Sequence, residues 1–399
     1  MTMGLNGVRV LELCDEKAEF CGKLLAWMGA EVIKIEPPKT GSSTRRLAPS
    51  SGTGKSLYFE VYNQGKKSVT LDLGTEAGRD VFRKLVAVSD VLIESNDPGS
   101  MKNLGLDYDE LSKIKKDLIM VSVTPFGQDG PWTGLRTSDL VSMSIGGISR
   151  TCGYDPVNGV YDTPPMTPNW GHSYQLGSVW AVLGALGALA AREEDGEGDY
   201  LDVSIYEAVS CCTEFSLQFW LYNGLGVMRQ EGRHALPKIF PPRQFRSADG
   251  NYVCAYHYAG RSDFEKLLKL LDAEKIEHEL GAPEFLEDEF RQRPENSQKI
   301  SEAVAKLVSR HGSEEMYSIS QKSGLTWTPV RGPKEILSDG HHRDRGFFVK
   351  VESEDAQGAI EYPGAPFICS DSPLFVRQRA PRLGENNREI LQGLLGLSD

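Results

Sequence analysis

The sequence predicts an α/β protein that combines a large domain, built on an open parallel sheet, with a smaller α+β domain. Three observations lead to this prediction. Short runs rich in β-branched residues alternate with helical patterns between residues 8 and 123. The chain has 399 residues, which is more than one compact domain usually holds. From about residue 225 the pattern changes to short strands and amphipathic helices that carry more charge.

The first part of the chain alternates strand and helix signals. Strands are expected over 8–13, 31–35, 67–73, 90–94 and 118–123, and helices over 19–28, 76–88 and 108–114. Gly29 is placed to end the first of these helices, and Thr75 to cap the second. This alternation implies right-handed crossovers and therefore a parallel, Rossmann-like sheet. Such sheets bind ligands beyond the carboxyl ends of their strands, here in loops 14–20, 36–46, 95–105 and 124–139.

The rest of the chain predicts a second domain and a segment that returns to the first. We expect a large domain over 1–220, a small α+β domain over 221–330 and a return segment over 331–399. The stretch 176–192 has almost no charge and is expected to be a buried core helix. A further group of residues either lines a pocket suited to aromatic groups or, as their mostly helical spacing favours, lies in the core: Trp170, Trp180, Phe215, Phe219 and Trp220.

Composition and charge exclude several classes of function. The formal net charge of −12 argues against non-specific binding of nucleic acid. The seven cysteines include no pair spaced for a metal, so free thiols in a reducing compartment are expected. The N-terminus shows no secretory signal, and the longest apolar stretch is interrupted by glycines and short for a bilayer. We expect a cytoplasmic protein that binds no membrane.

Two motifs that suggest nucleotide binding do not fit their context. The first strand–helix turn lacks GxGxxG, so a nicotinamide or flavin cofactor is not expected. The segment GTGKS at 52–56 resembles the end of a P-loop. However, the first glycine of that motif would fall on Pro49, and no clear strand precedes it.

Several segments, taken in order, resemble the family III CoA-transferases, the CaiB/BaiF type. The family's first strand, helix and second strand are similar to LNGVRVLEL and GAEVIKIEPP. Its middle motifs resemble NQGKKSVTLDL, IESNDPGSMKNLGL, VSVTPFGQDGPW and GDYLDVSIYEA. Its C-terminal motifs resemble RDRGFF, YPGAPF and APRLGENNREIL. The resemblance runs from end to end, and the order and spacing of the segments make a chance match improbable.

The resemblance implies a fold, a partner and a reaction. Two chains would thread through each other as interlocked rings. Family members move CoA from a thioester donor to a free carboxylate, so CoA thioesters are the implied substrates and no covalent cofactor is implied. A side-chain carboxylate attacks the thioester carbonyl and forms a mixed anhydride. CoA thiolate then forms an enzyme thioester, which the acceptor carboxylate resolves.

The chain departs from the family at the nucleophile. Counting from Pro164–Pro165, or back from Gly184, reaches Tyr174 where the family has an aspartate. A phenol with a pKa of about 10 is a poor nucleophile at neutral pH. Nearby His172 is read as a loop histidine. Asp155 and Asp162 could serve instead only with a gap of more than ten residues in the alignment.

The resemblance also implies positions for CoA. They are Lys17, Ala18, Leu71, Asp72, Ser95, Asn96, Asn103, Arg136 and Asp139. Some differ from the family, which often has Gln where this chain has Lys17 and Arg where it has Pro38. Asp139 could instead cap the following helix. Gly232, Arg233 and His234 resemble the start of the family's mobile substrate loop, or form a surface turn.

Several functions remain open at this point. The favoured one is a subunit without the nucleophile, paired with a related chain that carries the aspartate, in a transferase for aromatic or dicarboxylic acids. The alternatives are a self-sufficient transferase, as a homodimer with a non-standard nucleophile, and a protein that binds CoA thioesters without turnover. A CoA-ester racemase needs a His–Asp pair. The matching residues here are Ser138 and Tyr174.

Overall fold

The computed structural model describes residues 4–256, 260–353, 358–370 and 378–398. The chain folds into two compact units. The large unit comprises Met1–Ile148, Pro168–Thr213 and Gly340–Asp399, and the small unit comprises Ser149–Thr167 and Glu214–Asp339.

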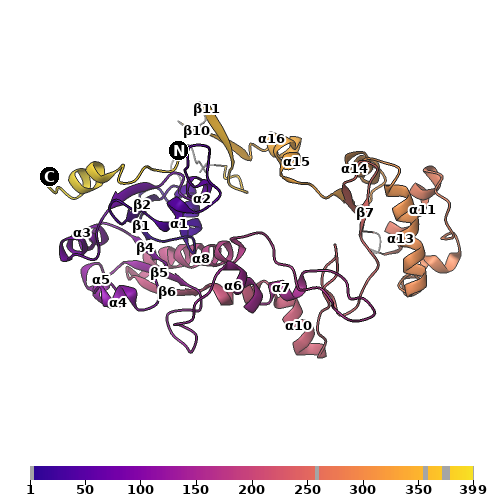
Figure 1. Cartoon of the computed structure of the whole chain (residues 1–399), viewed down its shortest axis with the longest axis horizontal. Helices are drawn as coiled ribbons and strands as arrows, with labels where there is room; N and C mark the ends of the chain where they lie inside the picture. Colours follow the sequence, from indigo (N-terminus) through magenta and orange to yellow (C-terminus); the bar gives the residue numbers. More distant parts are fainter. Residues whose placement is uncertain (1–3, 257–259, 354–357, 371–377, 399) are drawn as a thin grey trace. The chain divides into compact units, whose positions relative to one another are not determined.

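The large unit is built on a six-stranded parallel sheet with the order β3-β2-β1-β4-β5-β6 (Figure 1). Its strands are β1 (Arg9–Leu13), β2 (Glu31–Glu36), β3 (Lys67–Thr70), β4 (Val91–Glu94), β5 (Ile119–Thr124) and β6 (Asp199–Ser204). The α/β class with an open parallel sheet is thereby confirmed. Because the strand order reverses at β1, the crevice between the loops after β1 and β4 is where such sheets bind ligands.

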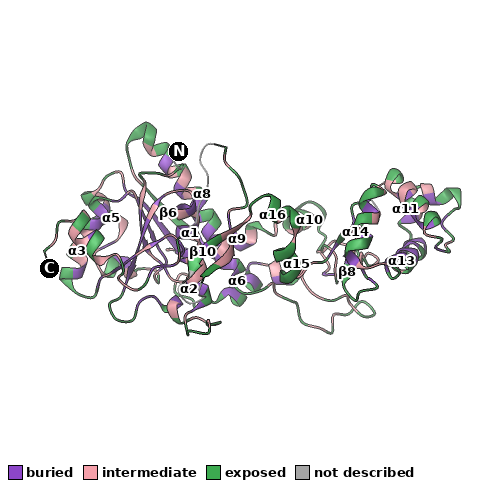
Figure 2. Cartoon of the chain, turned by 90° about the horizontal axis from the view of Figure 1, so that it is seen from above, coloured by how far each residue is buried: buried purple, intermediate pink, exposed green. Residues whose placement is uncertain are grey.

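Helices cover both faces of this sheet, as the nearly continuous apolar strands require. Val10 of β1 packs in one core with α1 (Glu19–Trp27) and α8 (His172–Asp195). Its neighbour Leu11 points to the other face and packs with α3 (Glu76–Ala87) and α5 (Tyr108–Ile114). In Figure 2 the inner strands of this sheet are coloured as buried, whereas the edge strand β6 is mostly exposed or half-buried.

The predicted helix ends are present. Gly29, at φ +104°, follows the last turn of α1 and donates its N–H to the carbonyl of Ala26 at 3.0 Å. The Thr75 side chain accepts from the Gly78 N–H at 3.1 Å and caps α3.

The central helix α8 is longer than expected and is not fully buried. Ala181 and Ala185 are completely buried against the sheet. Trp180 and Leu183, on another side of the helix, are 44% and 58% exposed. The low charge of this stretch therefore reflects an apolar outer face as well as a core face. Among the described residues, α8 is the one helix long and apolar enough to cross a membrane, and here it packs on the sheet.

The return segment attaches to the free edge of the sheet. Its hairpin consists of β10 (Phe348–Ser353) and β11 (Gly358–Pro363), and a short π-helix (Arg388–Leu394) brings Ile390 into the core. The Asn386 side chain accepts from the Ser68 N–H at 3.0 Å, and the Asn387 side chain accepts from the Thr70 N–H at 2.9 Å. These amides satisfy edge groups of β3 that would otherwise be open to pairing.

The small unit contains a three-stranded antiparallel sheet and a helical layer around Trp327 and Phe264. Its main elements are α10 (Glu214–Asn223), β7 (Gln244–Arg246), β8 (Tyr252–Cys254), α11 (Arg261–Ala273), α13 (Pro294–Val308), α14 (Ser313–Lys322) and β9 (Thr328–Pro329). Helix α10 has no buried residue, and Phe215 and Trp220 are 61% and 63% exposed. The expectation that these aromatics lie in the core was wrong, because helical spacing cannot show which faces of a helix are covered.

The remaining elements are short. They are η1 (Ser43–Arg46), α2 (Leu57–Tyr62), α4 (Ser100–Asn103), α6 (Asp139–Ile145), α7 (Ile148–Thr151), α9 (Ile205–Cys211), η2 (Pro283–Leu286), α12 (Asp288–Arg291), α15 (Pro333–Ser338) and α16 (Gly340–Asp344).

Candidate active site

A cavity of about 370 Å³ lies at the carboxyl ends of β1, β2 and β4 in the large unit. Four residues that the resemblance assigned to CoA line it: Leu71, Asp72, Ser95 and Asn96. Other lining residues come from the loops after β1 and β2, including Asp15, Gly41 and Ser42. This is the position expected for a ligand of a doubly wound sheet.

Ser95 joins the two loops that form the switch point. Its hydroxyl donates to the Asp15 carboxylate at 2.9 Å and accepts from the Asp15 N–H at 3.0 Å. Lys17 forms an ion pair with the same carboxylate. Lys17 and Asp15 are therefore mutually neutralised, so Lys17 does not stand as an isolated cation above the cavity.

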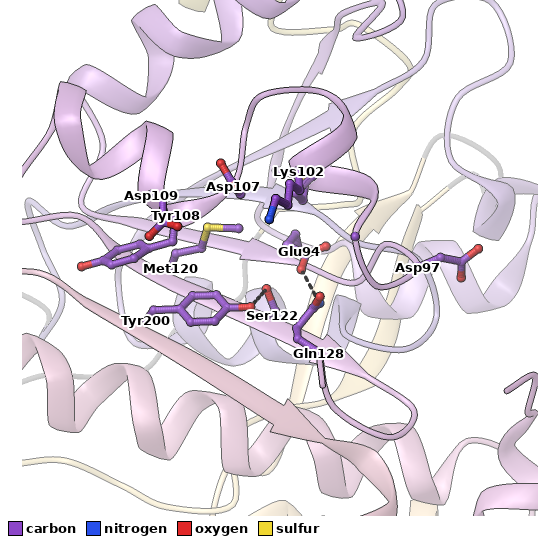
Figure 3. A pocket seen from close by; sticks show the side chains of 12 residues that line it. Glu94, Asp97, Lys102, Asp107, Tyr108, Asp109, Met120, Ser122, Gln128 and Tyr200 are labelled. Atoms are coloured by element: carbon purple, nitrogen blue, oxygen red, sulfur yellow. Dashed lines mark hydrogen bonds between the residues drawn. The ribbon is translucent and has the colours of Figure 1, made fainter. Parts of the chain in front are cut away.

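Asn96 is positioned by the carboxyl of Glu94, two residues before it at the end of β4. Glu94, 1% exposed, accepts from both the Asn96 N–H and its side-chain amide, at 2.8 and 3.0 Å. Burial raises the pKa of this carboxyl above its usual value. Figure 3 shows Gln128 reaching the other oxygen of Glu94.

Glu94 also lines a second cavity, of about 280 Å³, on β4, β5 and β6 (Figure 3). The rings of Tyr108 and Tyr200 stack there with centroids 5.6 Å apart, and the Tyr200 hydroxyl donates to Ser122 at 3.2 Å. The Glu94 carboxyl thus lies between the two cavities and links their polar groups.

A buried group of four charges lies beneath the loop after β1. Lys34 contacts both Glu12 and Glu19, at 3.1 and 2.7 Å. Lys66 contacts the second oxygen of Glu12 at 2.7 Å. All four side chains are at most 1% exposed, and each ammonium also donates to a backbone carbonyl. Two carboxylates balance two ammonium groups, so each buried charge has the partner that burial requires. The group thereby fixes the position of the loop after β1.

Gly22 makes this arrangement possible. A Cβ atom at this position would lie 1.8 Å from an oxygen of Glu12. The sequence analysis noted Lys66 but did not find its partners. The sequence carried no signal for them, because Glu12 and Lys34 become opposite neighbours only through the register of β1 and β2 in the folded sheet.

Tyr174 lies near the start of α8 and is 8% exposed. Burial and the carboxylates of Glu16, Asp139 and Asp15 raise the pKa of its phenol well above the usual value. Its ring meets Trp170 edge to face, at 6.4 Å, and Trp170 in turn meets Tyr58 at 5.1 Å. Tyr174 is therefore an un-ionised phenol whose ring packs in a cluster with two other aromatic rings.

Asp139 is the first residue of α6, but its carboxylate binds the first turn of α8, next to Tyr174. One of its oxygens accepts from both the N–H and the hydroxyl of Ser173, at 2.9 and 2.7 Å. Ser138, not Asp139, caps α6. The Asp139 carboxylate thus stabilises the first turn of α8, which explains why this helix begins at His172, before the predicted position.

The other predicted positions are not part of the cavity wall. Ala18 is completely buried in the core behind it, whereas Asn103 and Arg136 are exposed. Gly232, Arg233 and His234 belong to the small unit. Gly232 has φ +64°, and the Arg233 guanidinium forms an ion pair with Asp155. The carboxylate of Asp155, which was an alternative candidate for the nucleophile, is therefore engaged in an ion pair.

Comparison with known proteins identifies the chain. Residues 5–387 match the model of the family described as CoA-transferase family III. The chain belongs to this family. Among the residues that the structure describes, no group of three His, Cys, Asp or Glu side chains is arranged to hold a metal ion.

Named relatives of this family III chain are CoA-transferases. It is 32% identical to the succinyl-CoA:(R)-benzylsuccinate CoA-transferase subunit BbsE of Thauera aromatica, covering 98% of this chain and 94% of the relative. It is 31% identical to the succinyl-CoA–D-citramalate CoA-transferase of Chloroflexus aurantiacus, covering 99% and 95%. It is 30% identical to the succinyl-CoA–L-malate CoA-transferase beta subunit of that organism, covering 100% and 96%.

Solved structures of the family share the fold. A CAIB/BAIF family protein from Brucella suis superposes with a TM-score of 0.84 at 26% identity, covering 99% of this chain and 100% of that one. Rv3272 from Mycobacterium tuberculosis superposes with a TM-score of 0.79 at 25% identity, covering 97% and 98%.

Proposed function

We propose that this family III chain is the subunit of a heteromeric CoA-transferase that does not supply the nucleophile. A related chain, with an aspartate at the position of Tyr174, would supply it. The observation that carries the proposal is the buried, un-ionised phenol of Tyr174 at the position that the resemblance assigns to the acyl-accepting carboxylate.

The reaction needs a carboxylate for a chemical reason. A carboxylate oxygen attacks the thioester carbonyl, the C–S bond breaks, and CoA leaves as a thiolate while a mixed anhydride forms. The anhydride and the thioester are both activated acyl groups, so each later exchange is nearly balanced. A phenol with a raised pKa has almost no phenolate at neutral pH and lacks this route.

Several observations support a partner chain. Two of the relatives are named as subunits. Helix α8 of the large unit and helix α10 of the small unit each leave apolar side chains exposed, as surfaces covered in an assembly do. The proposal includes the interlocked pairing of the family. It also places the chain in the cytoplasm, because all seven cysteines are free thiols, as a reducing compartment favours.

The large-unit cavity is the proposed place for part of CoA. Leu71 provides an apolar wall, and Ser95 and Asn96 provide polar groups held by Asp15 and Glu94. The proposed acyl substrate is a dicarboxylic acid. Succinyl, citramalate and malate in the names of the relatives are of this class, and benzylsuccinate adds an aromatic ring.

Purified chains test the proposal. The chain alone should transfer no CoA from succinyl-CoA to a dicarboxylic acid, and co-expression with its partner should restore transfer. Tyr174→Phe should leave the activity of the pair within about twofold, since a phenol that takes no part in the chemistry loses only a hydroxyl. Robust transfer by the lone chain, lost in Tyr174→Phe, would overturn the proposal.

One observation favours a second candidate, a self-sufficient transferase. The Glu16 carboxyl is half-buried and interacts with Tyr174 electrostatically, and burial and Asp15 raise its pKa. Glu16 could then accept the acyl group. In that case the lone chain would be active, Glu16→Gln would abolish transfer, and Tyr174→Phe would not.

A further inference from the structure

A third cavity of the large unit, of about 180 Å³, is lined by four cations and one carboxylate. Two of the cations, Arg45 and Lys55, come from the segment between β2 and α2, and two, Arg379 and Arg382, come from the return segment. The carboxylate is Glu60 of α2. Because the whole chain carries a net charge of −12, a basic cavity is an exception on this protein.

Arg45 is fixed in place while one end of its guanidinium stays unused. Its Nε and Nη2 donate to the two oxygens of Glu36, both at 2.7 Å, and Nη2 also donates to the carbonyl of Pro381 at 3.1 Å. The guanidinium lies 3.9 Å from the ring centre of Phe59. These contacts leave the two N–H groups of Nη1 without an acceptor among the described residues. The side chain is 18% exposed, so a ligand in the cavity can reach it.

The segment GTGKS at 52–56, which resembles the end of a P-loop, forms a tight turn that brings Lys55 to this cavity. The Ser51 N–H donates to the Lys55 carbonyl at 2.7 Å, and the Ser51 hydroxyl accepts from the Lys55 N–H at 3.2 Å. Gly54 has φ +83°, a conformation that favours glycine. The backbone of this segment thus bonds to itself, and the segment contributes a lysine side chain to the cavity.

The return segment contributes its two arginines through a carboxylate that orients them. Arg379 donates to both oxygens of Glu385, at 2.9 and 2.7 Å, and the Arg382 N–H donates to one of them at 2.7 Å. Glu36 and Glu385 hold cations of the wall but do not line the cavity themselves. Even when these two carboxylates are counted, the group keeps an excess of positive charge, which an anion in the cavity would balance.

The cavity at the carboxyl ends of β1, β2 and β4 has the opposite character. No lysine or arginine is among the residues that line it, so it does not itself neutralise the phosphate groups of CoA. Glu36 lines that cavity, and its ion-pair partner Arg45 lines the basic one. The two cavities therefore adjoin at this ion pair.

We propose that the basic cavity binds a phosphate group. A phosphate monoester carries about 1.5 to 2 negative charges at pH 7 and has three acceptor oxygens, which suits several cations around one small space. Arg45 offers the two N–H groups of Nη1, and Lys55 and Arg382 add positive charge. The phosphate belongs either to CoA, whose ribose carries a phosphate monoester, or to a separate phosphorylated molecule. The first source rests on the transferase function proposed above, whereas the site itself does not depend on it.

Binding of inorganic phosphate to the full chain tests this site without using activity. Phosphate is titrated calorimetrically, at constant ionic strength in chloride, into the wild type, Lys55→Met, Arg382→Met and the control Arg46→Met. Arg46 is an exposed neighbour of Arg45 that donates to the Thr40 carbonyl and does not line the cavity. Loss of one charge-assisted contact should weaken phosphate binding on the order of 10-fold in the first two variants and leave Arg46→Met unchanged. Lys55→Arg keeps the charge and should keep binding within about threefold, which separates loss of charge from misfolding of the turn.

CoA and dephospho-CoA distinguish the two sources of the phosphate. If CoA supplies it, the wild type should bind CoA about tenfold more tightly than dephospho-CoA, and Lys55→Met should abolish this preference. If the two bind alike while inorganic phosphate still depends on Lys55 and Arg382, a separate phosphorylated molecule is the ligand. If neither phosphate binding nor a preference for CoA is detected, or neither depends on Lys55 and Arg382, the proposal is overturned. None of these measurements uses CoA transfer, so this failure is distinct from that of the proposed function, which the activity of the lone chain tests.

Discussion

Lys23 is a buried lysine whose replacement should stabilise the protein. The residue, on α1, is 4% exposed, and its ammonium lies over the rings of Trp27 and Tyr62, at 4.6 and 5.5 Å. It contacts no carboxylate among the described residues. Burial, with a smaller effect of Lys66, lowers the pKa of Lys23 from 10.5 to about 7.

The sign of the effect follows from proton linkage. Between pH 7 and 10.5 the unfolded chain holds a proton on Lys23 that the folded chain releases, so this residue makes stability rise with pH in that window. The full shift corresponds to about 5 kcal/mol, at about 1.4 kcal/mol for each pKa unit, and at pH 7, where the folded lysine is about half protonated, the cost is about 4 kcal/mol. The aromatic contacts return about 1 kcal/mol of this. Lys23→Met should therefore gain roughly 3 kcal/mol at pH 7.

Urea unfolding at pH 7, 8 and 9 measures this gain. The difference between Lys23→Met and the wild type should shrink by about 2 kcal/mol from pH 7 to pH 9. Folding removes the proton from the wild-type lysine, and the free energy needed to remove it falls as the pH approaches the unfolded pKa. Lys84→Met, at an exposed position of α3, is the matched control and should change stability little at any pH. A gain from Lys23→Met that is absent, or the same at all three pH values, would refute the reasoning.

Three further substitutions test how the large unit is held together. Gly22→Ala forces a methyl group against Glu12 and should cost about 3 kcal/mol of unfolding free energy, measured in urea with Gly4→Ala, in open space, as control. Asp139→Ala removes the acceptor of two Ser173 hydrogen bonds and should lower unfolding free energy by about 2 kcal/mol, a loss that Asp139→Asn should partly restore. Asn387→Ala uncovers the edge of β3 and should cost about 1–2 kcal/mol and speed amide exchange at Thr70. Unchanged exchange there would contradict the edge role.

Local signals in the sequence predicted much of the large unit. The alternation of strands and helices gave the parallel sheet, because side-chain periodicity and caps such as Thr75 act within a few residues. The end-to-end series of motifs identified the family. Three of the loops expected beyond the carboxyl ends of the strands, 14–20, 36–46 and 95–105, contribute residues to one cavity, since parallel strands end at one edge.

The pairing of charges was decided by the tertiary structure. Glu12 and Lys34 meet because β1 and β2 are neighbours in the sheet, and Lys66 joins them from a third segment. Nothing in local periodicity shows such partners. The exposed aromatics of α10 are a second example, because helical spacing gives the faces of a helix but not what covers them.

The sequence by itself determined the family, the sheet and the absence of a carboxylate at Tyr174, because these depend on residue identity and short-range pattern. Which charges are neutralised, which helix Asp139 stabilises and how β3 is closed at its edge depend on contacts between residues far apart in the chain. Such contacts form only when the chain is folded, since Coulomb and hydrogen-bond energies depend on distance in space and on burial, not on separation in sequence.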